Sequence, residues 1–347
     1  MARPTPSGPP ITRERMIELL DRMKSRQIVV VGDVMLDRYL VGDTDRLSPE
    51  APVAVVTIRD TRSALGGAAN VAANVAAIGA TCRLVGVVGD DVHGTQLRTE
   101  LATAHLDDRF LVTVSGRPTT TKSRVVARGQ QVVRIDEEVD YPVAGDDEER
   151  MIARAVAVLA DADAVILEDY NKGALTEPVI QAVIRTAKTR GVPIVVDPKF
   201  RNFFAFAGAT VFKPNRRELE AALGATLALH GETDLVAALG RLHVDNLLMT
   251  LGAEGMVLVG KDHRVTHIPS LAREVYDVSG AGDTVTAWLA TGLAAGASLR
   301  EAAHVANYAA GIEVSKAGVA TVSPSEVLAG HEERHDALGK LRRGGVI

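Results

Sequence analysis

Two hydrophobic patterns alternate along most of the chain. Continuous apolar runs rich in valine and isoleucine, such as residues 27–32, predict buried strands, whereas apolar residues spaced three or four apart predict helices. After Pro142 the alternation is regular, with expected strands at 164–168, 193–196, 210–212 and 246–251 and helices from about 146, 177, 217 and 234. This order predicts a three-layer α/β/α fold whose mainly parallel sheet has helices on both faces.

Two other segments have a different pattern. Residues 46–58 combine two prolines with a valine-rich run, which is typical of an edge strand. Residues 110–136 alternate polar with apolar side chains, which predicts half-exposed strands. We expect these strands to form a small β-sheet, drawn from about 38–60 and 110–137, that covers a ligand site as a lid.

The two ends of the chain are set apart from these patterns. Residues 1–26 combine a proline-rich tail with apolar residues at helical spacing, which predicts a short helix on the edge of the domain. The main domain is expected to span residues 27–328. The charged residues 329–347 are expected to form a peripheral tail.

Composition narrows the class of protein. Hydrophobic residues make up 46% of the 347 residues but aromatic residues only 3%, so the core must consist mainly of Ala, Val and Leu. The net charge is −5 and no block of basic residues occurs, which disfavours nucleic-acid binding. No apolar run reaches the roughly 18 residues that span a membrane, and the N-terminus lacks an apolar signal-peptide core. We therefore expect a cytoplasmic protein without a membrane segment.

Metal-binding patterns are sparse. Cys82 is the only cysteine, which excludes an internal disulfide and multi-cysteine zinc sites. Residues 331–335 read His-Glu-Glu-Arg-His, and two histidines four apart on a helix could hold zinc. We interpret them instead as a solvated helix face, because they lie in a short charged tail with no obvious third ligand.

The strongest candidate for chemistry is the segment 276–284, Tyr-Asp-Val-Ser-Gly-Ala-Gly-Asp-Thr, which leads into an apolar helical pattern. Gly280 and Gly282 lack β-carbons, so backbone N–H groups there can converge on an anion at the positive end of the helix. Asp283 could cap those amides or accept the proton of an attacking hydroxyl group, and the spacing fits both roles. We interpret the segment as a site of phosphoryl transfer, with an ordinary capped loop as the alternative.

Two further segments each allow a functional and a structural interpretation. Gly66 and Gly67 precede a helix of small residues, where a sugar ring could approach the backbone and Asn70 could bond its hydroxyl groups. A plain tight turn is the alternative. Asn215 and Glu218 are either magnesium-site residues or an N-cap and its capping-box partner.

These segments resemble motifs of the ribokinase-like (pfkB) family of carbohydrate kinases. Gly66 to Asn70 resembles the first family signature, Asn215 to Glu218 the Asn-x-x-Glu motif, and residues 277–284 the second signature, and the two signatures occur in the family's order along the chain. The resemblance implies a sugar kinase that depends on ATP and Mg²⁺. A monovalent cation such as K⁺ is a further cofactor that the resemblance allows. Asp283 would be the catalytic base, with Gly280, Ala281 and Gly282 as the anion hole, and Asn215 and Glu218 would order Mg²⁺ through water. The implied nucleotide-binding residues are Asn215, Arg216, Arg217, Glu218, Thr250, Gly252, Gly255 and Asn307.

Segments 32–39, 46–53 and 168–175 resemble one branch of this family more closely. That branch phosphorylates O1 of D-glycero-β-D-manno-heptose 7-phosphate, either freestanding or as half of a bifunctional heptose kinase/adenylyltransferase. The product, heptose 1,7-bisphosphate, would serve the synthesis of nucleotide-activated heptose for lipopolysaccharide core or another surface glycan. No H-x-G-H segment of a nucleotidyltransferase occurs, so the second activity is not expected.

The resemblance and the loop positions together give a set of acceptor-binding candidates. For the sugar they are Asp37, Gly66, Gly67, Asn70 and Asp169, with Glu168 as the alternative to Asp169 and Asp33 as a weaker candidate. For the 7-phosphate they are Arg46, Arg124, Arg128, Lys172 and Lys199, each of which could equally be a solvated surface charge.

Three other expectations concern partners and competing functions. An exposed lid strand predicts a homodimer that pairs through the lid. Another member of the same family, acting on ribose, fructose, a phosphosugar or a nucleoside, is the nearest competing function. A non-catalytic sugar-binding module is the other.

Overall fold

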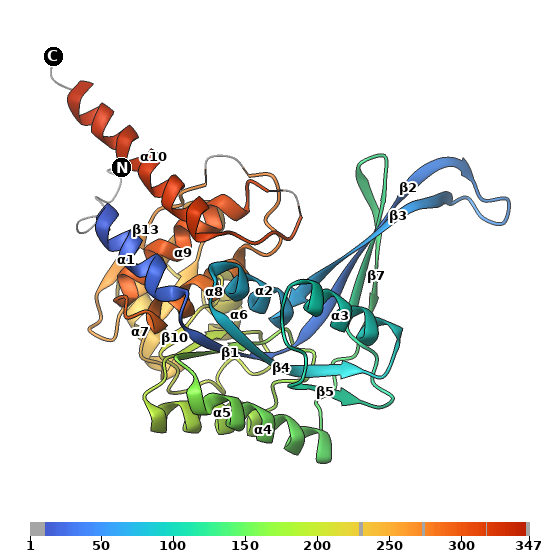
Figure 1. The fold of residues 1–347 in the computed structure, drawn as a ribbon, viewed down its shortest axis with the longest axis horizontal. Coiled ribbons are helices and arrows are strands. Elements are labelled where there is room, and N and C mark those ends of the chain that lie inside the picture. Colours follow the sequence, from blue (N-terminus) through green and yellow to red (C-terminus); the bar gives the residue numbers. More distant parts are fainter. Residues whose placement is uncertain (1–10, 229–231, 273–274, 317, 345–347) are drawn as a thin grey trace.

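The computed structural model describes residues 11–228, 232–272, 275–316 and 318–344. Nine strands of these residues form one central sheet (Figure 1), and in sheet order they are β13 (Val265–Ile268), β12 (Met256–Val259), β11 (Leu247–Thr250), β10 (Val211–Phe212), β9 (Ile194–Asp197), β8 (Ala164–Glu168), β1 (Gln27–Gly32), β4 (Thr81–Gly89) and β5 (Leu111–Val114). Neighbours from β11 to β5 pair in parallel, whereas β12 pairs antiparallel with β11 and β13. The mainly parallel sheet predicted from the sequence is confirmed.

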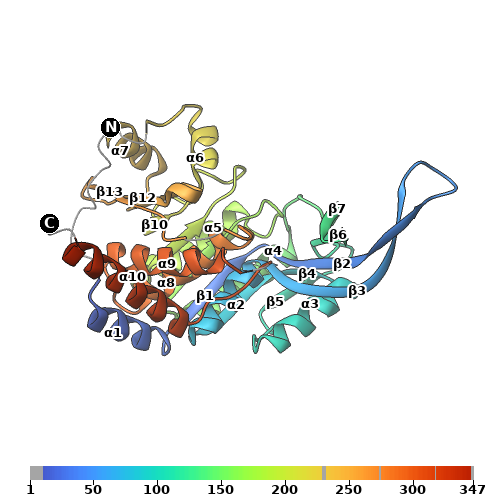
Figure 2. The ribbon, with the colours of Figure 1, turned by 90° about the horizontal axis from the view of Figure 1, so that it is seen from above.

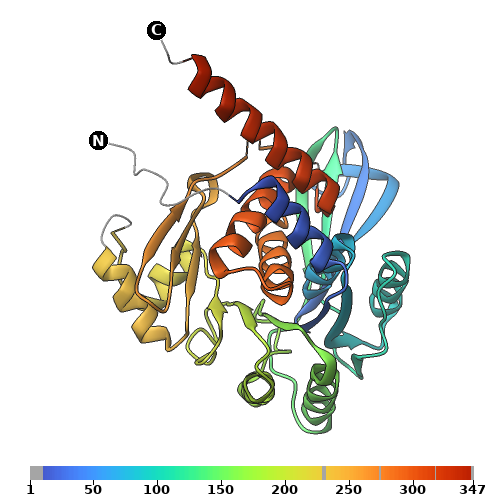
Figure 3. The same cartoon turned by 60° about the vertical axis from the view of Figure 1, so that its left-hand side comes forward.

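Helices cover both faces of this sheet (Figure 3). One hydrophobic cluster is formed with α1 (Arg13–Met23), α2 (Ala68–Ile78), α3 (Val92–Thr103), α8 (Ala281–Ala294) and α9 (Leu299–Glu313). A second is formed with α4 (Asp146–Val158), α5 (Glu177–Arg190), α6 (Arg216–Leu223) and α7 (Glu232–Leu242). Along β1, Ile28 and Val30 join the first cluster and Val29 and Val31 the second, as alternation in a strand buried on both faces requires. The three-layer α/β/α prediction is confirmed.

A four-stranded second sheet projects from the sandwich as the expected lid (Figures 1 and 2). Its order is β3 (Ala54–Gly67), β2 (Val34–Leu47), β6 (Thr121–Ala127) and β7 (Gln130–Glu137). The prediction that residues 110–137 all belong to the lid is wrong for 111–114, which form β5 at the edge of the main sheet. The reason is burial, since Leu111, Val112 and Val114 pack into the two hydrophobic clusters.

The C-terminal segment differs from the expected peripheral tail. Residues 324–344 form one helix, α10 (Pro324–Gly344), so the predicted boundary at residue 328 falls inside it. Its first turns pack on the sandwich, because Val327 and His331 are buried and His331 Nε2 lies 2.9 Å from the carbonyl oxygen of Ile11. The predicted solvated face is therefore wrong for His331, whereas the side chain of His335 lies outside the described residues.

The N-terminal segment contains the helix α1, whose apolar residues pack against the first hydrophobic cluster. Its apolar residues Met16, Leu19, Leu20 and Met23 are all buried. The proline-rich residues 1–10 lie outside the described part of the chain. Among the described residues, no helix combines the length and the apolar character that a membrane crossing needs.

A pair of leucine substitutions tests the packing of α8. Leu289 in α8 is fully buried, whereas Leu47 at the end of β2 is 68% exposed. We expect Leu289→Ala to lower the free energy of unfolding by about 2–5 kcal/mol, through lost apolar contacts and a residual cavity. Leu47→Ala should change it by less than about 0.5 kcal/mol. Equilibrium denaturation at one protein concentration measures both, and equal losses would show that α8 lies outside the cooperative core.

Candidate active site

The carboxyl ends of the central strands and the start of α8 meet at one place. Glu168 ends β8, Asp197 ends β9 and Lys213 follows β10, while Asp283 lies in the first turn of α8. The strand register pairs Glu168 with both Gly32 and Asp197, so the ends of these strands are level. Ligands of open α/β sheets bind at this carboxyl edge.

Asp283 is not a helix cap. The N-cap residue of α8 is Gly280, with φ of 95° in the left-handed region, and no side chain caps the first turn. The Asp283 carboxylate instead accepts hydrogen bonds from Asn70 Nδ2 at 2.7 Å and from the Tyr170 hydroxyl group at 2.8 Å. The first-turn amides are left without a side-chain acceptor, which is the arrangement that suits a bound anion.

The surroundings of Asp283 change its proton affinity. Burial raises the pKa of this carboxyl to about 6, although the hydrogen bonds from Asn70 and Tyr170 lower it. Burial and the charge of Asp283 in turn raise the pKa of the Tyr170 hydroxyl well above its usual value. Tyr170 therefore stays a neutral donor. The result is a carboxylate that can accept a proton near neutral pH.

Three buried carboxylates gather around this turn. Oxygens of Glu168, Asp197 and Asp283 lie within 4.8 Å of one another. Asp197 is bonded to Lys213 Nζ at 2.8 Å, whereas neither oxygen of Glu168 has a hydrogen-bond partner among the described residues. Burial, and then the charge of Asp197, raises the pKa of Glu168 well above its usual value. A buried carboxyl without a hydrogen-bond partner must carry a proton or bind a cation. The three carboxylates therefore form a candidate site for a metal ion.

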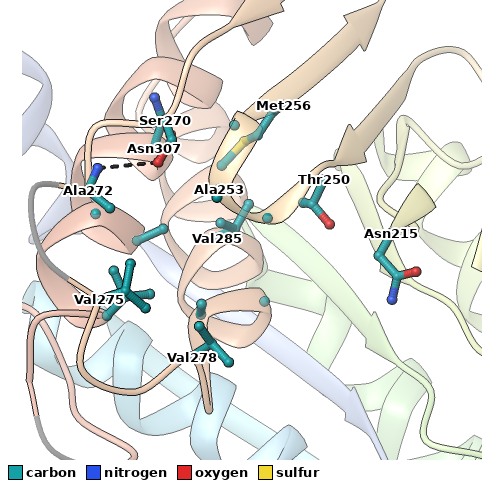
Figure 4. Close-up of a pocket in the computed structure, with 17 residues that line it drawn as sticks. Asn215, Thr250, Ala253, Met256, Ser270, Ala272, Val275, Val278, Val285 and Asn307 are labelled. Carbon is teal, nitrogen blue, oxygen red and sulfur yellow. Dashed lines mark hydrogen bonds between the residues drawn. The ribbon is translucent and has the colours of Figure 1, made fainter. Parts of the chain in front are cut away.

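A cavity of about 310 Å³ opens beside the first turn of α8 (Figure 4). The predicted nucleotide-binding residues that line it are Asn215, Thr250, Gly252, Gly255 and Asn307. Figure 4 shows Asn215 and Thr250 on one side of it and Val275 and Val278 on the other. Mainly apolar walls with a few polar groups are typical of a pocket for a small-molecule ligand.

Two glycines of the predicted nucleotide loop have different structural roles. A β-carbon added to Gly255 would lie 2.1 Å from the carbonyl oxygen of Ile268, so the close approach of β13 requires glycine there. Gly252 has φ of 59° and open space where a β-carbon would stand. Asn307 Nδ2 donates to the carbonyl oxygen of Pro269 at 2.9 Å. Asn307 thus holds the segment that closes the cavity.

Four of the five predicted sugar-binding residues, Asp37, Gly66, Gly67 and Asn70, lie together, and Asn70 contacts Asp283. Gly67, with φ of 56°, is the N-cap of α2, and Asn70 in the first turn of that helix reaches the Asp283 carboxylate. A β-carbon added to Gly66 would lie 2.7 Å from Asp37 Oδ2. The Asp37 carboxylate also forms an ion pair with Arg124. The structure therefore brings the two signature segments into one site.

Two predicted phosphate ligands lie far from this site. Arg46 is exposed near the end of β2, and nine residues of extended strand beyond Asp37 correspond to about 30 Å. Arg128 is exposed at the turn after β6 and pairs with Asp45 at 2.9 Å. Within one chain, neither arginine reaches the pocket, because the lid strands carry both of them away from the sandwich.

Two aspartates predicted as sugar-binding candidates, Asp33 and Asp169, accept hydrogen bonds from backbone amides of the loop after β8. Asp33 accepts the amides of Tyr170, Lys172 and Ala174 at 2.8–2.9 Å, as its weaker candidacy for sugar binding anticipated. Asp169 accepts the amide of Asn171 at 2.7 Å and an amide hydrogen of the Asn202 side chain. Of the neighbouring pair 168–169, Glu168 is therefore the residue that lies against Asp283.

The Asn-x-x-Glu segment forms a complete capping box. Asn215 Oδ1 accepts the Glu218 amide and Glu218 Oε2 accepts the Asn215 amide, both at 2.9 Å. The other oxygen of Glu218 binds Lys199. Arg216 pairs with Glu220 on its own helix, and Arg217 is exposed and does not line the cavity. Of these residues, Asn215 alone lines the cavity.

Sequence reasoning missed three residues of the site, Tyr170, Asp197 and Lys213. Each follows or ends a predicted strand, so the carboxyl-edge rule offered a signal for all three. A β-carbon added to Gly282 would lie 3.6 Å from Lys213 Nζ and 3.8 Å from Asp197 Oδ2, which places both beside the glycine turn. Burial lowers the pKa of Lys213, but Asp197 and Glu168 outweigh it and raise the pKa, so the ammonium group stays charged.

Known proteins with similar sequences include one family model and several curated relatives. The model of the pfkB family of carbohydrate kinases matches residues 25–326. Bifunctional protein HldE of Azorhizobium caulinodans is 48% identical over 311 residues, which cover 88% of this chain and 64% of the relative. The protein of the same name from Rhodospirillum rubrum is 41% identical over 348 residues, covering 95% and 70%. The chain thus spans about two thirds of the length of these relatives.

Solved structures share the fold at lower sequence identity. A ribokinase of Arabidopsis thaliana complexed with ribose and ATP has a TM-score of 0.69 at 22% identity, covering 88% of this chain and 98% of that one. Phosphofructokinase-2 of Escherichia coli in complex with substrates and products has a TM-score of 0.72 at 18% identity, covering 89% and 99%. These similarities show the ribokinase-like fold. With the family match over residues 25–326, they establish that the chain belongs to the pfkB family and is an ATP-dependent carbohydrate kinase.

Proposed function

We propose that this kinase transfers a phosphoryl group from ATP to O1 of D-glycero-β-D-manno-heptose 7-phosphate in the cytoplasm. The observation that carries the proposal is the position of Asp283. Asn70, in the first turn of α2 after Gly66 and Gly67, donates to its carboxylate, and Gly282 of the same turn as Asp283 lines the cavity of about 310 Å³. The choice of heptose rests on the segments 32–39, 46–53 and 168–175, which resemble that branch of the family. The heptose 1,7-bisphosphate formed would serve the synthesis of nucleotide-activated heptose for surface glycans.

The side chains suit an in-line phosphoryl transfer. The γ-phosphate would lie at the first turn of α8, where the amides of Gly280 to Gly282 and the Lys213 ammonium group neutralise its charge. Asp283 accepts the proton of the anomeric hydroxyl group, and Asn70 and Tyr170 hold the carboxylate in place. Asp37 would accept hydrogen bonds from the sugar hydroxyl groups.

Mg²⁺ fits the carboxylates at the ends of β8 and β9. Oxygen ligands are the ones that Mg²⁺ prefers, and Glu168 has both oxygens without a hydrogen-bond partner. Glu168 and Asp197 would hold the ion directly, with Asn215 and Glu218 acting through water. When bound, Mg²⁺ neutralises phosphate charge. A monovalent cation such as K⁺ remains part of the proposal, and a phosphofructokinase-2 structure in complex with potassium shares the fold.

The lid supports a homodimer. All eight residues of β7 are exposed, and β7 is an edge strand of the lid sheet. Three apolar side chains of this strand, Val132, Val133 and Ile135, are 47–49% exposed. An apolar unpaired edge is a liability that pairing with a second copy removes.

Light scattering tests the dimer. We expect a mass of twice the 36.7 kDa chain, because the lid edge pairs with a second copy. Val133→Lys should give the monomer mass by placing a charge on the apolar edge. Val156→Lys, at an exposed position of α4, should leave the mass unchanged. A wild-type monomer at micromolar concentration would contradict pairing through the lid.

An acceptor screen tests the proposed substrate. ADP release is measured with heptose 7-phosphate, fructose 1-phosphate, ribose and adenosine. We expect kcat/KM for heptose 7-phosphate to exceed the others by about 100-fold or more, since a site built to bind polar substrate groups strongly rejects acceptors that lack them. A higher value for another acceptor would reassign the substrate, and no ADP release with any of them would favour a sugar-binding module.

The pH dependence tests Asp283 as the base. Because the base acts as the carboxylate and its pKa is about 6, kcat/KM should be flat above that pH and fall below it. Asp283→Asn should lower kcat by about 10²–10⁴-fold and leave ATP binding unchanged. Tyr170→Phe removes a hydrogen bond that lowers the Asp283 pKa, so the acid limb should move to higher pH, whereas Tyr308→Phe should not move it. Wild-type turnover in Asp283→Asn would remove this residue as the base.

A further inference from the structure

Two lysines from different parts of the fold share one carboxylate at the junction of lid and sandwich. Lys122 lies in β6 of the lid, and Lys172 lies in the loop after β8. Glu138, the residue after β7, accepts Lys172 Nζ at 2.7 Å through one oxygen and Lys122 Nζ at 2.9 Å through the other. The side chains of the two lysines are only 18% and 16% exposed. These residues are therefore enclosed, unlike the charges on the outer lid.

The register of the lid strands places Lys122 on the face that carries the sugar-binding carboxylate. Asp37 of β2 is paired with Lys122 of β6, and Tyr39 with Arg124, so these four side chains share one face. The contacts agree, because Arg124 forms an ion pair with Asp37 and lies over the Tyr39 ring. Asp37 in turn lies against Gly66, another of the predicted sugar-binding residues. Lys122 and Arg124 thus lie on the lid face beside Asp37, and we refer to these two cations together with Lys172 as the rim cations.

Lys172 is fixed relative to the catalytic carboxylate by a rigid loop. Asp33 accepts the amides of both Tyr170 and Lys172 at 2.8 and 2.9 Å. Tyr170 bonds Asp283 through its hydroxyl group, two residues before Lys172. Since one buried carboxylate holds both amides, the spacing between the base and the lysine is set by the loop and not by the ligand.

Each of the rim cations already has a carboxylate partner. Lys172 binds Glu138, Arg124 binds Asp37, and Lys122 binds both Glu138 and Asp136. Glu138 is ionised, because the hydrogen bonds from the two lysines outweigh its burial and lower its pKa. A carboxylate between two lysines has the charge and the acceptor oxygens that a phosphate group would bring to the same place.

We propose that Lys122 and Lys172 form the subsite for the phosphate that the acceptor sugar already carries, and that Glu138 occupies this subsite until the acceptor displaces it. The proposal rests on the proposed function, because it concerns a phosphorylated acceptor bound with its other end at Asp283. An unphosphorylated sugar leaves the two lysines paired with Glu138 and gains nothing from them. The three residues therefore select for acceptors with a distal phosphate.

Binding measurements with matched acceptors test the subsite. Isothermal titration with a non-hydrolysable ATP analogue present gives Kd for heptose 7-phosphate and for unphosphorylated heptose. Lys122→Met and Lys172→Met should each raise Kd for heptose 7-phosphate by about tenfold or more, as loss of a charge-assisted hydrogen bond predicts. Kd for unphosphorylated heptose should stay the same. Lys24→Met, which removes an exposed lysine paired with Asp21, is the control and should change neither value.

A third variant separates a phosphate subsite from a structural contact. Glu138→Gln removes the competing charge but keeps the size of the side chain, so it should lower Kd for heptose 7-phosphate several-fold. A purely structural ion-pair network predicts the reverse, with weaker binding of both sugars in all three variants, and that result would overturn the proposal. Thermal unfolding of each variant shows that it is folded.

The outcomes for the subsite and for the heptose substrate are distinct. If the wild type binds heptose 7-phosphate and the lysine variants bind it equally well, the subsite is wrong and the proposed function stands. If the wild type does not bind heptose 7-phosphate, the proposed substrate is wrong. The same titrations with fructose 1-phosphate and with fructose then test the subsite. Equal affinity for the phosphorylated and the unphosphorylated sugar would overturn it.

Discussion

The active site depends on keeping one buried carboxylate both ionisable and next to a place for phosphate. Burying a carboxylate without a hydrogen-bond partner costs several kcal/mol. This cost is comparable with the small net free energy of unfolding of a domain. Asp283 is compensated by two neutral donors, Asn70 from α2 and Tyr170 from the loop after β8. Because neither donor carries a positive charge, the carboxylate keeps a raised pKa of about 6 and with it the basicity that proton transfer needs.

The two hydrogen bonds to Asp283 require elements from distant parts of the sequence to lie side by side. Helix α2, the loop after β8 and helix α8 must converge to within hydrogen-bond distance of a single side chain. The loop is held in turn by Asp33 at the end of β1, which contributes no contact to the cavity beside α8. A residue that does not line the cavity thus determines where Tyr170, a hydrogen-bond donor to Asp283, lies.

Charge is arranged differently at the two ends of the site. At the sheet edge, the ammonium groups of Lys213 and Lys199 lie near the carboxylates of Glu168, Asp197 and Asp283. Neither oxygen of Glu168 has a hydrogen-bond partner among the described residues, so a cation or a bound proton must compensate this carboxyl. At the lid, Lys122 and Lys172 share the Glu138 carboxylate and Arg124 pairs with Asp37, so an anionic ligand there exchanges with a carboxylate and does not simply add to it. The first end suits the nucleotide and its metal, and the second suits a phosphorylated acceptor.

The sequence alone determined the elements and the chemistry of the glycine turn. Local patterns suffice for this, since buried strands, amphipathic helices and the glycines at 280 and 282 follow from spacing and from the absence of a β-carbon. The mainly parallel sheet and the small second sheet were predicted in this way. For Gly66, Asn70 and Asp283 the patterns allowed a functional and a structural interpretation, and the resemblance to the carbohydrate kinases favoured the functional one and added Asp37. The capping-box alternative for Asn215 and Glu218 was also visible in the spelling of the segment, and both of its hydrogen bonds are present.

Only the tertiary structure decided which charged side chains belong to the site. Arg46 and Arg128 share the lid with Arg124, yet strand length carries them away, and Glu168 rather than Asp169 lies against Asp283 because successive side chains leave a strand on opposite faces. Tyr170, Lys213 and Glu138 gain their roles from contacts with residues far away in the sequence, as His331 does by packing beneath Ile11. A side chain's charge is written in the sequence, but the distance to its partner exists only once strands and helices have packed, and electrostatic and hydrogen-bond energies depend on that distance.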